Sequence, residues 1–390
     1  MCQGYKFGGV AAGLKKNGQK DLALIFSEVS ASVAGVFTRN RVQAAPVLLD
    51  RQRIKTGMVQ AVIVNSGNAN CCTGVQGVQD ALYMARMAAS GLGIAEEQVL
   101  VASTGVIGEP LPIAKIEAAM PDLIRALRTD GATHFARAIM TTDTVPKIVT
   151  RQGQVDGIPF MITGIAKGAG MIRPDMATML SFAVSDIAAS SVALQPMLKA
   201  ASDRSFNRIT IDGDTSTNDT ALLLANGLSG AVISSPAHCA IFQSVLDDVL
   251  MTLAKQLVKD GEGATKLVEI AVKGALTDKD AYQIADTVAN SNLLKTALFG
   301  EDANWGRILA AAGRAGVPLQ PDKVDICFDK VLMVKDGMGC GQAAEREATR
   351  VLKKPQFEIT IDLKLGAGAA SVFTCDFSID YVKINADYRS

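Results

Sequence analysis

Short apolar runs that end in small polar residues alternate with helical stretches along the first half of this 390-residue chain. The runs at 61–67 (AVIVNSG) and 98–104 (QVLVAST) have the pattern of buried strands that open into loops. Between them, residues 78–93 (VQDALYMARMAASGLG) have helical spacing and stop at Gly93, a favourable helix end. This alternation predicts a mixed α/β fold, with helices packed on sheets.

The remaining pattern extends this prediction. Residues 111–131 read as a helix interrupted near Pro121, and residues 241–261 read as an amphipathic helix that ends at Gly261. Residues 208–212 read as a strand that is followed by a polar loop. The alternating runs at 356–366 and 370–378 predict a hairpin around a short glycine-containing turn.

Bulk composition limits the classes of function. A chain of 390 residues is long for one hydrophobic core, so two domains or lobes are expected. Lys+Arg and Asp+Glu are both 39, so there is no basic excess of the kind that nucleic acid or an anionic membrane attracts. The longest apolar runs fall short of the ~20 residues that span a bilayer. With no secretory signal pattern at the start, we expect a cytoplasmic protein.

Cysteine and histidine usage narrows the chemistry. The seven cysteines are scattered, and no C-x-x-C is present, which favours reduced thiols and argues against a structural zinc site. The chain has two histidines, His134 and His238, and each stands apart from other reactive residues in the sequence. A nucleophilic enzyme built from this sequence is therefore expected to use a base other than imidazole.

The segment 167–180 (KGAGMIRPDMATML) places one hydroxyl, that of Thr178, after a stretch rich in Gly, Pro and Met. A strained peptide before a threonine can undergo an N-to-O acyl shift, in which the Thr178 oxygen attacks the Ala177 carbonyl and water then hydrolyses the ester. The new α-amine of Thr178, with a pKa of about 8, can then serve as base for its own hydroxyl. On chemistry alone, a structural threonine at the start of a buried strand remains the alternative.

The whole string resembles the self-cleavage motif of the ornithine acetyltransferase, or glutamate N-acetyltransferase, family of arginine biosynthesis. Further blocks that look like this family follow in the family's order over nearly the whole chain: VNSGNANCCTG (64–74), STGVIG (103–108), MTTDTVPK (140–147), STNDT (216–220), DGEGATKL (260–267), GEDANWGRI (300–308) and the terminal DYVKINADYRS. Three positions depart from the usual pattern, namely Cys71, Ala169 and Asp175, and none removes an atom that the mechanism requires.

The resemblance implies a layered α-β-β-α two-lobe fold. It implies cleavage between Ala177 and Thr178 into chains of residues 1–177 and 178–390, which stay associated as an α2β2 tetramer. Thr178 matches the nucleophile, and Thr104 and Gly105 match the oxyanion hole. The implied substrate-binding residues are Lys167, either Thr141 or Thr142, Glu262, Asn385 and Ser390. We expect the C-terminal tail to be ordered and to fold back into the pocket.

The function that this resemblance implies is transfer of the acetyl group from N2-acetyl-L-ornithine to L-glutamate through an acetyl-threonine ester. No metal or organic cofactor is expected, and the sequence leaves open whether acetyl-CoA also serves as donor. Two rival readings remain: a related self-cleaving aminopeptidase that releases acyl groups to water, and a binding protein for amino acids of this pathway that never cleaves itself.

Overall fold

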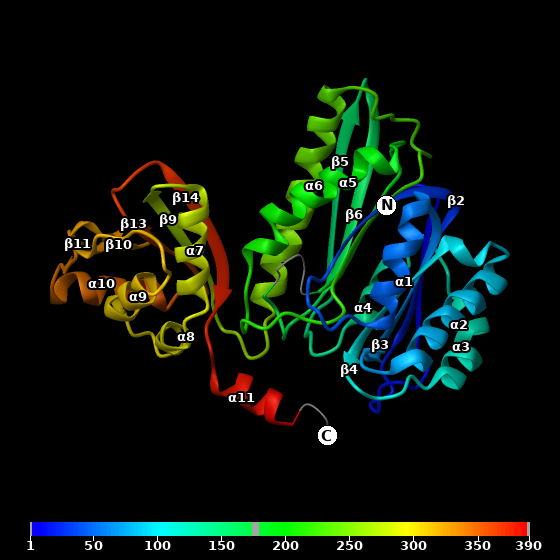
Figure 1. Ribbon diagram of the computed structural model, residues 1–390, viewed down its shortest axis with the longest axis horizontal. Coiled ribbons are helices and arrows are strands. Elements are labelled where there is room, and N and C mark those ends of the chain that lie inside the picture. Colours follow the sequence, from blue (N-terminus) through cyan, green and yellow to red (C-terminus); the bar gives the residue numbers. More distant parts are fainter. Residues whose placement is uncertain (1, 174–178, 388–390) are drawn as a thin grey trace. The chain divides into compact units, whose positions relative to one another are not determined.

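A computed structural model describes residues 2–173 and 179–387 (Figure 1). Ala177, Thr178 and Ser390, and also Asp175, lie outside the described residues. The chain forms two compact units. Unit 1 comprises Met1–Asn207 and Asp214–Leu257, and unit 2 comprises Arg208–Gly213 and Val258–Ser390. Each unit contains one β-sheet, so the predicted mixed α/β class is confirmed. The predicted boundary between residues 177 and 178 and the order of the four layers stay predictions.

The sheet of unit 1 has the strand order β4-β3-β2-β8-β7-β6-β5, and β1 pairs with β2. The pairs β3/β4 and β7/β8 are parallel, and the other neighbours are antiparallel. Every residue of β7 and β8 is buried, as expected for strands covered on both faces. The strands are Tyr5–Val10 (β1), Leu22–Phe37 (β2), Met58–Asn68 (β3), Val99–Val106 (β4), Lys147–Val155 (β5), Ile158–Lys167 (β6), Leu180–Ser185 (β7) and Thr220–Ala225 (β8).

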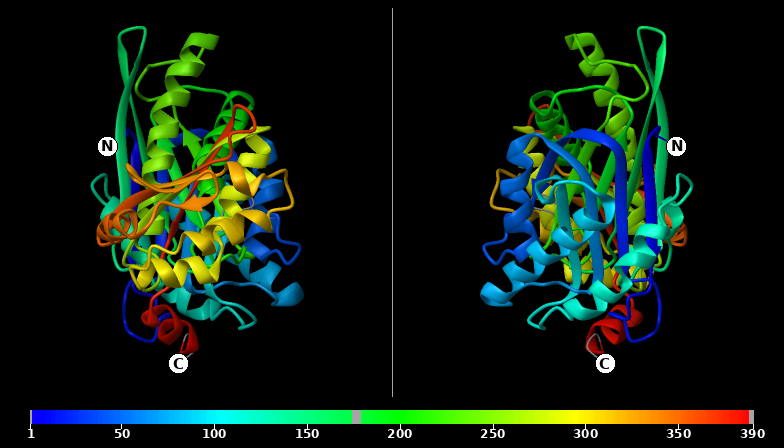
Figure 2. Two further views of the ribbon diagram at one scale, coloured as in Figure 1. Left: turned by 90° about the vertical axis from the view of Figure 1, so that its left-hand side faces the viewer. Right: turned by 90° about the vertical axis from the view of Figure 1, so that its right-hand side faces the viewer.

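Helices cover the sheet of unit 1. α2 and α3 lie on one side of β2, β3 and β4 (Figure 2). Side chains such as Met84 and Leu123 belong to the core cluster on that side. On α4, Phe135 packs edge-on between Phe7 and Phe182, with ring centroids 6.2 and 5.5 Å away. The helices are Ala45–Arg53 (α1), Gly74–Leu92 (α2), Ile113–Arg125 (α3), Ala132–Ile139 (α4), Ser191–Arg204 (α5) and Pro236–Lys259 (α6).

Among the described helices, α6 alone is long and apolar enough to cross a membrane, by length and composition only. Its fully buried apolar side chains recur at helical spacing from Phe242 through Leu246, Leu250 and Leu253 to Leu257. Such a stripe is typical of a core helix packed on one face.

The sheet of unit 2 has the order β12-β11-β10-β13-β9-β14. Val268, Ile270, Ile359 and Ile361 lie in the buried core, against side chains of the helices that cover that face. The strands are Leu267–Ala275 (β9), Asp325–Phe328 (β10), Val331–Lys335 (β11), Met338–Gly339 (β12), Gln356–Asp362 (β13) and Gly368–Cys375 (β14). The helices are Asp278–Ala289 (α7), Asn292–Phe299 (α8), Trp305–Gly313 (α9), Gln342–Leu352 (α10) and Ile379–Ala386 (α11).

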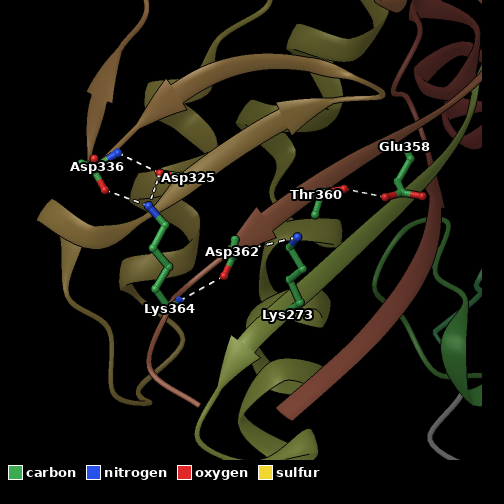
Figure 3. A network of polar contacts seen from close by, with 7 residues as sticks. All are labelled: Lys273, Asp325, Asp336, Glu358, Thr360, Asp362 and Lys364. Atoms are coloured by element: carbon green, nitrogen blue, oxygen red, sulfur yellow. Dashed lines mark hydrogen bonds and ion pairs between the residues drawn. The ribbon is translucent and has the colours of Figure 1, made fainter. Parts of the chain in front are cut away.

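The alternate residues of β13 form a polar network on the other face of this sheet (Figure 3). Glu358, Thr360 and Asp362 are partly exposed, whereas the residues between them are buried. Next to them, Lys364 Nζ lies 2.6 Å from Asp325 Oδ1 and 2.7 Å from Asp336 Oδ1. This period-two pattern explains why the strand was recognisable in the sequence.

Three local predictions were wrong. Residues 356–362 and 368–375 form no hairpin, because β9 lies between β13 and β14 and pairs with both. Pro121 does not interrupt α3, which runs continuously through it. The strand expected at 208–212 is not formed, and among these residues only Ile209 makes an isolated β-bridge. The strand in this part of the chain is β8, which follows the polar loop.

Candidate active site

The carboxyl ends of the parallel strands β3 and β4 form the first part of the site. Ser66 lies opposite Thr104, and Gly67 lies opposite Gly105. Gly105 has a φ of +133°, and a Cβ there would lie 2.3 Å from the carbonyl carbon of Gly67. Only glycine fits this position, because a side chain would meet backbone that is part of the sheet. Because the backbone at Gly105 is constrained in this way, the position of the preceding residue, Thr104, at the end of β4 is also constrained.

Asn218, which sequence reasoning did not single out, ties the polar loop before β8 to these strand ends. Its side-chain amide donates to the carbonyl oxygens of Ala69 (2.6 Å) and Ser103 (2.8 Å). Ser103 in turn donates its hydroxyl to Asn65 Oδ1, at 2.5 Å. Three of the sequence blocks on which the family resemblance rests, 64–74, 103–108 and 216–220, therefore meet in one place.

Lys167 joins the same place from β6, where it is the last residue. Its Nζ donates to Thr104 Oγ1 at 3.0 Å, and the residue is 7% exposed. The structure thus brings together Thr104 and Lys167, which are 63 positions apart in the chain. Across the sheet, Lys167 lies opposite Leu180 on β7, two positions after Thr178 in the sequence.

Asp143 organises the segment between α4 and β5. Its Oδ1 accepts hydrogen bonds from Lys147 Nζ and from the backbone N–H of Gly168, both at 2.7 Å, and its Oδ2 accepts from the N–H of Thr141 at 3.1 Å. The side chains of Asp143 and Lys147 are both buried. Burial raises the pKa of Asp143, but the charges of Lys167 and Lys147 and these hydrogen bonds hold it below its ordinary value. Asp143 is therefore a charged carboxylate at neutral pH.

Thr141 and Thr142 are both half-buried. Thr141 is positioned by the hydrogen bond from its N–H to Asp143. Which of the two threonines contacts a substrate stays a prediction.

Lys15 is a second residue that sequence reasoning missed. It lies in the loop between β1 and β2, and Asp21 holds this loop by accepting from the N–H groups of Ala12, Leu14 and Lys15. Lys15 Nζ donates to the carbonyl oxygens of Lys20 (2.8 Å) and Met140 (2.7 Å), directly before Thr141. Burial and, to a smaller extent, the charge of Lys167 lower the pKa of Lys15 to about 8, against the effect of nearby carboxylates.

In unit 2 the structure brings together two other predicted residues. Asn385 on α11 donates its side-chain amide to Glu262 Oε2 at 2.8 Å, and Glu262 is buried. A Cβ on Gly263 would lie 2.6 Å from the N–H nitrogen of Tyr381, so this glycine lets the loop approach α11 closely. The C-terminal residues up to Ala386 are therefore an ordered helix rather than a frayed end.

The predicted nucleophile and scissile bond, Thr178 and Ala177, lie outside the described residues, as does Ser390. The described residues next to this gap contact the loop before β8. Thr215 Oγ1 donates to the carbonyl of Arg173 at 2.9 Å, and the N–H of Thr220 donates to the carbonyl of Met179 at 3.0 Å.

The two histidines contact other parts of unit 1. His134 Nδ1 lies 2.8 Å from Lys20 Nζ, and the charge of this lysine, followed by burial, lowers the pKa of His134. His238 Nε2 lies 3.2 Å from Asp156 Oδ1. Among the described residues, neither histidine contacts Thr104 or Lys167, in keeping with chemistry that does not depend on imidazole.

Comparison with known proteins shows the family of this chain. Residues 6–390 match the model of the ArgJ family. The chain is 52% identical to the arginine biosynthesis bifunctional protein ArgJ of Geobacter sulfurreducens, over all of this chain and 99% of that protein. It is 51% identical to the protein of the same name from Syntrophotalea carbinolica, over 99% of both.

Among solved structures, a chain of the arginine biosynthesis bifunctional protein ArgJ from Bacillus halodurans is similar. The two are 41% identical with a TM-score of 0.51, and the match covers 54% of this chain and 99% of that chain. The fold, the site and these relatives define an acyltransferase enzyme of arginine biosynthesis. The chain belongs to the ArgJ family.

Proposed function

We propose that this enzyme transfers the acetyl group of N2-acetyl-L-ornithine to L-glutamate through an ester on Thr178, after cutting its own chain between Ala177 and Thr178. The observation that carries this proposal is the 3.0 Å contact between Lys167 and Thr104. The contact supports the proposal because a buried cation, suited to a substrate carboxylate, lies next to a residue suited to stabilise an oxyanion.

Self-cleavage is needed to create the base. The Thr178 oxygen attacks the Ala177 carbonyl and the peptide C–N bond breaks, so that residues 1–177 are held as an ester. Water then cleaves this ester, which leaves a carboxylate on Ala177 and a free α-amine on Thr178.

Transfer then proceeds in two half-reactions. The α-amine takes the hydroxyl proton of Thr178, and the oxygen attacks the acetyl carbonyl of acetylornithine. Thr104 and Gly105 stabilise the negative oxygen of the tetrahedral intermediate. The amine of ornithine leaves with the proton, and the amine of glutamate next attacks the acetyl-threonine ester, which regenerates the free hydroxyl.

Recognition uses opposite charges. Lys167 binds the α-carboxylate of the amino acid, with Thr141 or Thr142 as a further contact. The family resemblance further assigns Glu262, Asn385 and Ser390 to substrate binding, with Glu262 suited to an amino group. We further propose that the enzyme is an α2β2 assembly in the cytoplasm and that it needs no metal or organic cofactor. Acetyl-CoA serves as an additional acetyl donor.

The Thr178→Ala variant tests the proposal. A denaturing gel and intact-mass measurement of purified wild-type protein should show two fragments divided at residue 177, and the variant should stay as one chain without transferase activity. Thr252→Ala, at a partly exposed position of α6, is the matched control and should cleave and react normally. Transfer by uncut Thr178→Ala protein would contradict the assignment.

A second assay separates transfer from hydrolysis. Purified wild-type protein is incubated with acetylornithine with and without glutamate, and acetate and acetylglutamate are quantified. A transferase forms acetylglutamate and little free acetate. Equal release of acetate in both incubations would favour the related aminopeptidase reaction instead.

A further inference from the structure

A surface cavity of unit 1, with a volume of about 390 Å³, is lined by basic side chains. Four of its lining residues are basic, namely Lys20, Arg125, Arg128 and His134, and none of the described residues that line it is acidic. None of the described residues that the acetyl-transfer mechanism uses lines it. Cavities of about 300–1,000 Å³ typically hold small organic ligands, so the size and the lining of this cavity suit a small anion.

Lys20 brings a positive charge into this cavity, and no carboxylate pairs with it among the described residues. Its Nζ donates to the carbonyl oxygen of Gly9 at 2.8 Å and lies 2.8 Å from Nδ1 of His134. A carbonyl oxygen and an imidazole nitrogen can accept hydrogen bonds, but neither carries a negative charge. Burial and the charge of Arg137 lower the pKa of Lys20, because both disfavour its charged form. A bound anion would offset both effects.

The charges that act on His134 are positive on balance. The charge of Lys20 and then burial lower the pKa of His134. The charges of Arg128 and Arg137 act in the same direction, and that of Asp130 opposes them without cancelling their effect. An anion bound in the cavity would stabilise the protonated imidazole and would therefore raise the pKa of His134.

The two arginines of the cavity have carboxylate partners outside its lining. Arg125 pairs with Asp122, and Arg128 pairs with Asp130. All four side chains are more than half exposed, so water screens these pairs. A guanidinium group has five N–H donors in a planar fork, and one carboxylate takes up two of them at most in a bidentate pair. Each arginine can therefore also donate to an anion in the cavity.

Backbone contacts hold the walls of the cavity in place. The N–H of Phe7 donates to the carbonyl of Arg128 at 2.9 Å, and the N–H of Arg128 donates back to the carbonyl of Phe7 at 3.1 Å. This pair of hydrogen bonds joins β1 to the loop before α4. A Cβ on Gly9 would lie 2.3 Å from the carbonyl oxygen of His134, so glycine at this position lets β1 lie close to α4. The basic side chains are thus presented from a fixed backbone.

We propose that this cavity binds a phosphate group, either as inorganic phosphate or as part of a small phosphate ester, through Lys20, Arg125, Arg128 and His134. A phosphate monoester has a charge of about −1.5 to −2 at pH 7 and three strong acceptor oxygens, so it can accept from several of these donors at once. Lysine and arginine are both typical phosphate ligands in proteins. The inference goes beyond the acetyl-transfer function proposed above and does not depend on it.

The first test uses the two histidines of the chain, His134 and His238. Wild-type protein with ¹³C-labelled histidine rings is titrated by NMR, with inorganic phosphate or with sodium chloride of equal ionic strength, and His238→Gln assigns the signals. Phosphate should raise the pKa of His134 by about half a unit or more. His238, which contacts Asp156 and does not line the cavity, should not respond. An unchanged titration of His134, or equal shifts of both histidines, would overturn the proposal.

The second test measures binding by calorimetry with inorganic phosphate and with glycerol 3-phosphate, and the tighter of the two identifies the form of phosphate that the cavity prefers. Lys20→Met should weaken binding about tenfold or more through loss of a charge-assisted hydrogen bond, and Lys20→Arg should retain most of it. Lys55→Met removes an exposed lysine that does not line the cavity and should bind like wild type. Equal weakening in Lys20→Met and Lys55→Met, or no binding of either compound to wild-type protein, would refute the proposal. The wild-type measurements decide the question even if a variant fails to fold.

Discussion

Asp143→Asn is the substitution for which the structure gives the most definite energetic expectation. Asp143 Oδ1 accepts from Lys147 Nζ and from the N–H of Gly168, and Oδ2 accepts from the N–H of Thr141. An asparagine keeps one acceptor oxygen and turns an amide toward groups that are themselves donors. Lys147, which is 1% exposed, then loses the carboxylate that lies 2.7 Å from its Nζ.

The expected loss of stability follows from this burial. Removing one partner of a buried ion pair costs about 3–5 kcal/mol, because the other charge stays buried and unpaired. For a unit of this size, about 1 kcal/mol shifts Tm by about 2–4 °C, so Tm should fall by about 6–20 °C. Thermal unfolding followed by circular dichroism measures this change. The double variant Asp143→Asn, Lys147→Met should recover much of the loss, since it also removes the buried positive charge.

The control is another lysine–aspartate pair at the same sequence spacing. Lys199 and Asp203 are paired on the surface, with side chains 51% and 41% exposed. Asp203→Asn should cost less than about 1 kcal/mol, because water screens this pair. If Asp143→Asn lowers Tm no more than Asp203→Asn does, the reasoning about burial is wrong.

The same substitution predicts a pH dependence. The pKa of Asp143 is lowered in the folded protein, so its contribution to stability is present above the unfolded pKa of about 4 and is lost as pH falls through the folded value. The difference in Tm between wild type and Asp143→Asn should therefore be full at pH 7 and shrink below about pH 4. A difference that grows on acidification would contradict a lowered pKa.

Three further predictions concern single residues of the site. Gly105→Ala should abolish transfer, because its Cβ would lie 2.3 Å from the backbone of Gly67. Gly108→Ala, at a φ of +86° with no atom within 4 Å of the added Cβ, should retain activity and lower the free energy of unfolding by only about 1 kcal/mol. Lys15→Met should raise the KM for acetylornithine severalfold, whereas Lys15→Arg should keep it near the wild-type value, as measured by steady-state kinetics. An equal rise in KM in the Met and Arg variants would exclude a role for the charge. Asn385→Ala should raise KM about fivefold through loss of its hydrogen bond to Glu262, with Tm nearly unchanged; an unchanged KM would remove Asn385 from the site.

The local sequence pattern predicted most elements of the first half. β3, α2 and β4 were recognisable because each has a clear period and an end signal, such as the glycine after Leu92. The pairing of β13 with β14 was not predictable, since nothing in either strand shows that β9, about 90 residues earlier, lies between them. Pro121 misled the prediction because α3 runs through it, held by the buried Met120 and Leu123 on either side, while Pro121 itself is exposed.

For the site, the motifs identified residues by type and by resemblance but could not give their partners. Thr104 and Lys167 were named from the sequence, and their 3.0 Å contact became evident only in the fold. Asn218 and Lys15 were missed because each works through backbone carbonyls, which carry no sequence signal. Asp143, four positions before Lys147 in the block MTTDTVPK, was a usable sequence signal for their buried ion pair.

Protonation states are the part of this site that sequence cannot supply. Asp143 and Asp219 are both buried aspartates within polar blocks, and their sequences give no reason to treat them differently. Their pKa values diverge because Asp143 lies beside the charges of Lys167 and Lys147 and accepts two backbone hydrogen bonds, whereas burial dominates at Asp219, whose Oδ2 has no hydrogen-bond partner among the described residues. The charge of the site is thus set by the hydrogen bonds around each aspartate, which depend on strands and loops that come together only on folding.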